Sequence, residues 1–152
     1  MSIISYEKLN PDRPVYREQV NKIEALMKQM PQVEIPVTHH FSLGLYARTI
    51  YIPAGATVVG KLHKYPQLNI LAKGKLLVSV DDGINLLEAV KIISSPAGTK
   101  RIAHAVEDSI WITVHSTDET DLDKIEEHFI AQSEEEYLEF IQANQLTLPL
   151  EA

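Results

Sequence analysis

Three polar side chains that could bind a ligand alternate within the stretch 53–74. They are His63, Tyr65 and Gln67, and they follow an apolar run that begins in a Pro-Ala-Gly turn. In an extended segment, residues two positions apart lie on the same face. An imidazole, a phenol and an amide on one face can donate and accept hydrogen bonds. The imidazole can also move a proton or bind a metal near neutral pH.

A second stretch, residues 95–104, repeats the pattern about thirty residues later. It contains another Pro-Ala-Gly turn, followed by Lys100, Arg101 and His104. The two stretches together hold most of the side chains in this sequence that could carry chemistry.

The elements that position these stretches begin with a helix. Pro14 is suited to a first helical turn, and the spacing predicts a helix from about Val15 to Met30 that ends at Pro31. An apolar stripe at three- and four-residue spacing, which includes Ile23 and Met30, is expected to pack against a sheet or a partner subunit.

Short apolar segments separated by Pro and Gly turns follow the helix. Asp81-Asp82-Gly83 is expected to form a hairpin turn. Antiparallel strands at this spacing, with no helix between them, indicate a sandwich or a small barrel. The expected strands are 45–52, 57–63, 67–73, 75–80, 86–93 and 109–115.

The chain becomes helical again after His115. Thr120 or Asp121 can cap a first helix, and Ser133 to Glu136 matches a capping box that begins a second one. The predicted organisation is a single domain over 1–152. It comprises an N-terminal segment and helix (1–31), a β barrel (32–116) and two C-terminal helices (117–152).

Charge and composition exclude several classes of protein. The 152 residues contain no cysteine, so there is no disulfide framework and no thiolate site. The net charge is −7, but residues 116–152 carry a balance of −10 and residues 1–115 one of +3. A pI near 5.3 argues against a generic nucleic-acid binder. With no signal peptide and no apolar run of about 20 residues, the sequence predicts a cytoplasmic protein without a membrane span.

The two turn-and-strand stretches resemble the two-part signature of the cupin barrels. Four segments, MPQVEIPVTHHFSLGLYARTIYIPAG, HKYPQLNILAKG, PAGTKR and AVEDSIWITVHSTDETDLDKIEE, are similar to small single-domain cupins encoded by tailed bacteriophages. The resemblance implies a mainly β, antiparallel jelly-roll barrel with an N-terminal helix and two C-terminal helices. It also implies a homodimer, paired through a sheet edge or a helix, and, for a phage-encoded protein, a location in the host cytoplasm.

The metal ligands of the cupin family are only partly present. His63 matches the first histidine, Tyr65 stands at the second, and Gln67 stands near the glutamate. Arg101 occupies the region of the third histidine, with His104 three positions further on. Since zinc or iron needs three or four suitable donors, we expect no cofactor. The alternative is one divalent transition metal held by His63, Gln67 and His104.

Basic residues concentrate in the same two stretches, and Arg48 lies on the preceding strand. Such a cluster suits an anionic ligand, because Arg binds phosphate or carboxylate through two bonds and Lys supplies a point charge. The alternative is unrelated surface charge. Trp111 is expected in the core, and His115 is expected to be packed or on the surface. The predicted ligand-binding residues are Arg48, Lys61, His63, Tyr65, Gln67, Lys100, Arg101 and His104.

Two functions follow from these residues. The first is capture of an anionic small molecule such as a nucleotide, which for a phage would sequester a host defence signal. The second is a cupin-type isomerase, epimerase or metal-dependent oxygenase acting on a sugar nucleotide or small acid. In that case His63 or His104 would be the base or a metal ligand and Tyr65 the acid. No catalytic residue is assigned, and the sequence favours the binding protein.

Overall fold

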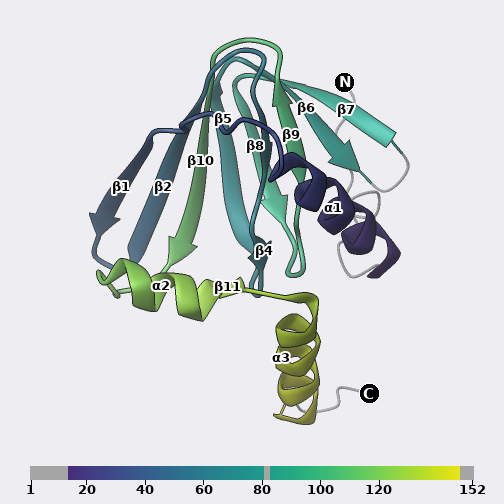
Figure 1. The fold of residues 1–152 in the computed structure, drawn as a ribbon. Coiled ribbons are helices and arrows are strands. Elements are labelled where there is room, and N and C mark those ends of the chain that lie inside the picture. Colours follow the sequence, from purple (N-terminus) through teal and green to yellow (C-terminus); the bar gives the residue numbers. More distant parts are fainter. Residues whose placement is uncertain (1–13, 81–82, 148–152) are drawn as a thin grey trace.

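The computed structural model describes residues 14–80 and 83–147, and Figure 1 shows how their elements are arranged. The chain forms an N-terminal helix, a run of antiparallel strands and two C-terminal helices. This confirms the predicted mainly β class with its three helices. The elements are α1 (Pro14–Met27), β1 (Val37–Ser42), β2 (Leu45–Ile52), β3 (Thr57–Val59), β4 (Leu62–His63), β5 (Gln67–Lys73), β6 (Lys75–Val80), β7 (Gly83–Glu88), β8 (Lys91–Ser95), β9 (Ile102–Ala105), β10 (Ser109–Ser116), α2 (Leu122–Phe129), β11 (Ile130–Ala131) and α3 (Glu134–Thr147).

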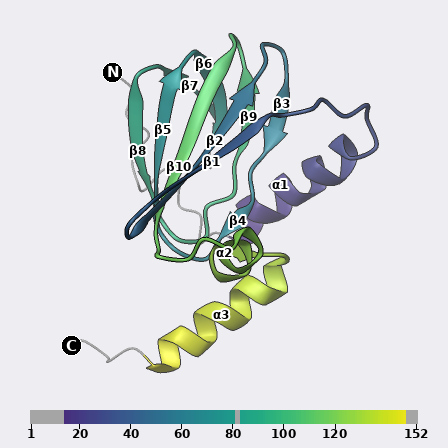
Figure 2. The ribbon, with the colours of Figure 1, turned by 90° about the vertical axis from the view of Figure 1, so that its left-hand side faces the viewer.

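Two antiparallel sheets form the barrel. The five-stranded sheet has the order β1-β2-β10-β5-β8, and the four-stranded sheet has the order β3-β9-β6-β7. A short ladder pairs β4 with β11 and so ties the chain after α2 to the barrel. In Figures 1 and 2, α2 lies across the lower end of the barrel and α3 lies below it.

The inner faces of the two sheets share one apolar core. Ile52 and Leu71 come from the five-stranded sheet, and Leu76, Val78 and Leu87 come from the four-stranded sheet. All five side chains are at most 2% exposed. Because neighbouring strand residues point to opposite faces, the alternation in the sequence fixes which side chains enter this core.

Two predicted strands are wrong in their extent. The segment 57–63 divides into β3 and β4 at Gly60, whose N–H donates to the carbonyl of Arg101 at 2.7 Å. The segment 86–93 divides between β7 and β8, which belong to different sheets. A continuous apolar run does not show where a chain leaves one sheet for the other. The predicted hairpin between β6 and β7 is confirmed by their pairing, but Asp81 and Asp82 lie outside the described residues.

Helix α1 ends earlier than predicted, at Met27 instead of Met30. The side chain of Gln32 donates to the carbonyls of Met27 and Met30, at 2.9 and 2.8 Å, and thereby satisfies the end of the helix. The predicted apolar stripe is only partly buried: Val20 is 2% exposed, whereas Ile23 is 44% exposed and Met30 62%. The described residues of α1 that are buried, Tyr16, Arg17 and Val20, all lie in its first two turns.

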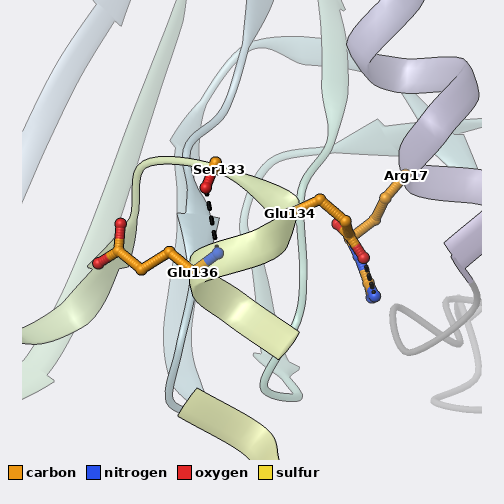
Figure 3. Close-up of polar contacts among 4 residues, drawn as sticks. All are labelled: Arg17, Ser133, Glu134 and Glu136. Carbon is orange, nitrogen blue, oxygen red and sulfur yellow. Dashed lines mark hydrogen bonds and ion pairs between the residues drawn. The ribbon is translucent and has the colours of Figure 1, made fainter. Parts of the chain in front are cut away.

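Both C-terminal helices begin as predicted. Asp121, one of the two alternatives, caps α2 by accepting hydrogen bonds from the N–H groups of Asp123 and Lys124. Ser133 accepts a bond from the N–H of Glu136 at 3.1 Å, as Figure 3 shows, and the Glu136 carboxylate accepts one from the N–H of Gln132. In the usual capping box, the Glu carboxylate accepts a bond from the N–H of the N-cap residue. Here the Glu136 carboxylate accepts from Gln132, the residue before the N-cap Ser133.

A buried ion pair joins the first helix to the last. The guanidinium of Arg17, only 1% exposed, donates through Nε and Nη2 to the carboxylate of Glu134, with its shortest contact at 2.7 Å (Figure 3). The same guanidinium carbon lies 4.8 Å from the ring centre of Tyr137. Residues more than a hundred positions apart therefore fix where α3 sits relative to α1.

Gly74 occupies a backbone position that no other residue fits. It has a φ of +92°, and a Cβ added there would overlap the backbone of Asp108 and Ser109. We expect Gly74→Ala to lower the free energy of unfolding by about 3 kcal/mol or more, because strain and a steric clash act together. Urea unfolding followed by circular dichroism measures the change.

The matched control is Gly55→Ala. Gly55 has a similar φ of +86°, but nothing lies within 4 Å of an added Cβ. We expect a loss of about 1 kcal/mol from backbone strain alone. Equal losses in the two variants would show that the close approach at Gly74 has no energetic role.

Candidate ligand-binding site

A cavity of about 380 Å³ lies inside the barrel between the two sheets. Helix α2 supplies part of its wall through Leu122, Ile125, Glu126 and Phe129. The apolar residues of α2 recur at three- and four-residue spacing, so one face of the helix points into the barrel. The N-cap at Asp121 fixes where this face begins.

The strand registers divide the lining into successive layers. On β2 and β10, Tyr46 pairs with His115, Arg48 with Thr113, and Ile50 with Trp111. All six residues line the cavity. The pair next to α2 is aromatic, the next pair is polar, and the third is apolar. One end of the cavity is therefore polar and the other apolar.

Two histidine rings lie together at the polar end. The ring centres of His63 and His115 are 5.5 Å apart, and His115 also stacks on Phe129 at 4.3 Å. Burial, helped by the neighbouring His115 and the cation of Arg101, lowers the pKa of His63 to about 3. Burial and His128 lower the pKa of His115 to about 4. Both rings are therefore neutral at neutral pH.

These histidines predict a pH dependence of stability. In the unfolded chain each takes up a proton near pH 6.5, whereas the folded protein resists protonation down to about pH 3 to 4. The unfolded state binds more protons between these values, so the free energy of unfolding falls as the pH decreases from 6.5. Each residue contributes up to about 1.4 kcal/mol per pH unit.

Urea unfolding between pH 7.5 and 5 measures how the free energy of unfolding changes with pH. This range lies above the pH at which carboxylates titrate, so their contribution is small. A His63→Gln/His115→Gln double variant should have a flatter slope over the same range. An unchanged slope in the double variant would assign the dependence to other groups.

Three cations line the cavity. Arg101 donates from Nη2 to the hydroxyl of Ser95 at 2.7 Å, and burial lowers its pKa to about 10, so it remains charged. Lys61 pairs with the carboxylate of Glu126 on α2. Arg48 makes no hydrogen bond or ion pair with any other residue in the described parts of the chain. It is the cation most available to a ligand.

Several buried polar atoms on the lining residues also lack a partner. Within residues 14–80 and 83–147 they include Nδ1 of His63, Oε1 of Gln67, Nε of Arg101 and Nδ1 of His115. Buried polar atoms in folded proteins are nearly always hydrogen-bonded to protein, water or a ligand. Their concentration around one cavity favours a polar occupant.

The structure brings together five of the eight predicted site residues. Arg48, Lys61, His63, Gln67 and Arg101 line the cavity. The period-two pattern places them there, because each lies on the inner side of its strand or turn.

The other three predicted residues lie elsewhere. Tyr65 packs against His128 and Phe140, on the outer side of α2. Lys100 binds Glu24 of α1 at 2.9 Å. His104 accepts or donates a 2.7 Å hydrogen bond with the hydroxyl of Thr57, outside the lining. The expectation that one cavity gathers all eight residues is therefore wrong for these three. Pro66 follows Tyr65, and this break in the strand ends the alternation on which its placement depended.

Sequence reasoning missed several lining residues. His115 and Trp111 were expected as packed or core side chains, yet both line the cavity, and Trp111 also contacts the core cluster. Asn69 is 2% exposed and donates to Ser95 at 2.6 Å. His39 is hydrogen-bonded to the hydroxyl of Tyr46 at 2.7 Å. The alternation of β10 and β5 was the available signal for three of these residues.

The donor set does not fit a metal well. Across the described residues, no group of three or more His, Asp or Glu side chains is arranged to hold a metal ion. Of the candidates, His63 and Gln67 share the cavity, but His104 does not. Arg48, Lys61 and Arg101 line the same cavity, so the site already contains positive charge. A divalent cation would add to that charge.

No protein-family model matches the chain, and no curated protein matches it in sequence. Solved structures similar to it include several cupins. A cupin-superfamily protein from Desulfitobacterium hafniense is 12% identical, with a TM-score of 0.49, over 59% of this chain and 83% of its own. KdgF from Halomonas sp. is 22% identical, with a TM-score of 0.48, over 60% of this chain and 86% of its own.

A third similar structure is an RmlC-like cupin from Shewanella frigidimarina. It is 24% identical, with a TM-score of 0.47, over 61% of this chain and 89% of its own. At these identities the similarity concerns the fold alone. Within the described residues, no helix is long and apolar enough to span a membrane.

Proposed function

We propose that this chain is a small-molecule-binding protein that captures an anionic ligand inside its barrel. The observation that carries the proposal is the guanidinium of Arg48, which is bonded to no other described residue and shares the cavity with Lys61 and Arg101. An anion placed there gains charge-assisted hydrogen bonds, which are about twice as strong as neutral ones. The neutral rings of His63 and His115 add donors or acceptors without adding charge.

A nucleotide is one ligand of this class. Its phosphate would lie against Arg48 and Lys61, with its base further inside. In a phage-encoded protein, such binding would remove a host signalling nucleotide from a defence pathway. The cavity volume is within the range of small-molecule sites, about 300–1,000 Å³.

Native mass spectrometry of protein purified from cells, compared with its denatured mass, tests this proposal directly. We expect a retained adduct that is lost on denaturation. A thermal-shift panel of nucleotides and organic acids then ranks ligands, since binding at 100 times Kd stabilises by about 2.7 kcal/mol. An apo mass together with no thermal shift from any anion would refute the proposal.

The alternative is a cupin-type isomerase, epimerase or oxygenase. His63 supports it, as a histidine in a cavity that is also lined by Tyr46 and His115, whose ring centres are 6.2 Å apart. Tyr65 and His104, the other residues expected to act in an enzyme, lie outside the cavity. Turnover of a sugar nucleotide that is lost in His63→Ala, with ligand affinity retained, would favour the enzyme over the binding protein.

A further inference from the structure

We infer that the captured ligand is an amphipathic anion: a carboxylate or phosphate joined to an apolar body about as long as a medium-chain acyl group. This inference rests on the proposed function. Beyond that function, it specifies which part of the ligand lies at which end of the cavity.

The polar end lies beside α2. Tyr46 and His115 form the layer next to the helix, and Arg48 and Thr113 form the layer above it. Lys61 reaches the same end, where it pairs with Glu126 of α2. A carboxylate placed here contacts Arg48 while it remains close to the neutral histidine pair.

The opposite end of the cavity is lined almost entirely by hydrocarbon. Ile50 and Trp111 form the first layer of this end, and they pack against the shared core. The remaining apolar lining residues here are Ile52, Val58, Leu76, Val78 and Ala103. Of the polar lining residues nearest to them, Thr113 and Asn69 are already bonded to each other at 3.0 Å. A nucleobase would find few hydrogen-bond partners at this end, whereas an alkyl chain needs none.

The length of the cavity sets the length of the ligand. Trp111 is two residues along β10 from Thr113, which pairs with Arg48, a distance of about 7 Å at the usual rise per strand residue. An extended chain of about eight carbons, anchored at Arg48, would reach Trp111 and the side chains beyond it. Shorter acids would leave this end unfilled.

Isothermal titration calorimetry with straight-chain carboxylates from butyrate to decanoate tests the inference. We expect affinity to rise up to about fourfold per added methylene, until the cavity is full. Primary alcohols of equal length are the matched probes without charge, and they should bind at least tenfold more weakly. Adenosine monophosphate serves as the competing class.

The orientation has its own readout, because Trp111 is the only tryptophan of the chain. Bromine quenches indole fluorescence at short range. We expect 8-bromooctanoate to quench Trp111 strongly and 2-bromooctanoate to quench it weakly at equal occupancy. No variant is needed, so a folding defect cannot obscure the result.

The outcomes separate the two proposals. If no anion binds, the proposed function itself fails. If adenosine monophosphate binds more tightly than every carboxylate, or if affinity does not depend on chain length, anion capture stands and the amphipathic ligand is refuted. Equal quenching by the two bromo acids would refute the orientation.

Discussion

Replacing Arg48 with glutamine is expected to lower the affinity for an anionic ligand by about 10- to 100-fold. This range follows from the loss of a hydrogen bond to a charged group, worth about 1.5–3 kcal/mol. Arg48 lines the cavity and is bonded to no other described residue, so the variant should fold with unchanged or higher stability. Calorimetric titration with octanoate and with adenosine monophosphate measures the loss.

The control for this variant is Lys73→Gln. Lys73 is an exposed cation at the end of β5 and does not line the cavity. The Lys73→Gln substitution removes the same formal charge as Arg48→Gln, so it corrects for any general electrostatic effect on affinity. Equal losses of affinity in the two variants, or none in Arg48→Gln, would mean that the cavity does not hold the anion.

The second large effect is expected at Glu134. Glu134→Ala leaves the guanidinium of Arg17 buried without its carboxylate, and breaking such a pair costs about 3–5 kcal/mol in the free energy of unfolding. We expect the lower end of this range, because the side chain of Glu134 is 29% exposed and the pair is therefore only partly shielded from water. Urea unfolding followed by circular dichroism measures the change.

Two further variants isolate the cause. Glu18→Ala removes an exposed partner of Lys22, in a pair whose side chains are 67% and 73% exposed. It should change the free energy of unfolding by less than about 0.5 kcal/mol. An Arg17→Met/Glu134→Leu variant should recover most of the loss, because it removes the buried charge together with its partner. If Glu134→Ala and Glu18→Ala lowered the free energy of unfolding by the same small amount, the ion pair between α1 and α3 would not stabilise the fold.

The local structure was predictable where one residue type determines one geometry. Asp121 and Ser133 mark the starts of α2 and α3 because their side chains accept bonds from N–H groups that a helix start leaves unpaired. The antiparallel pairing of β6 with β7 was predictable from the turn residues between them. Strand breaks were less predictable, since a glycine such as Gly60 can lie within a strand as well as end one.

The candidate site was predictable to the extent that alternation holds. His63, Gln67 and Arg101 were expected in one site, and they line one cavity. Tyr65 was placed by the same rule and lies outside it, because the chain turns toward α2 before Pro66. Lys100 and His104 are drawn to partners that are distant in sequence, Glu24 and Thr57, and no spacing rule reveals such partners.

The sequence by itself determined the class of fold, the number of helices and the polar character of two stretches. These properties depend on hydrophobic period, capping residues and turn residues, all of which act over a few positions. The tertiary structure alone decided that Trp111 and His115 line a cavity, that α2 forms part of its wall, and that Arg48 lines it without a bond to any other described residue. Each of these depends on strands and helices that are far apart in the chain but pack together.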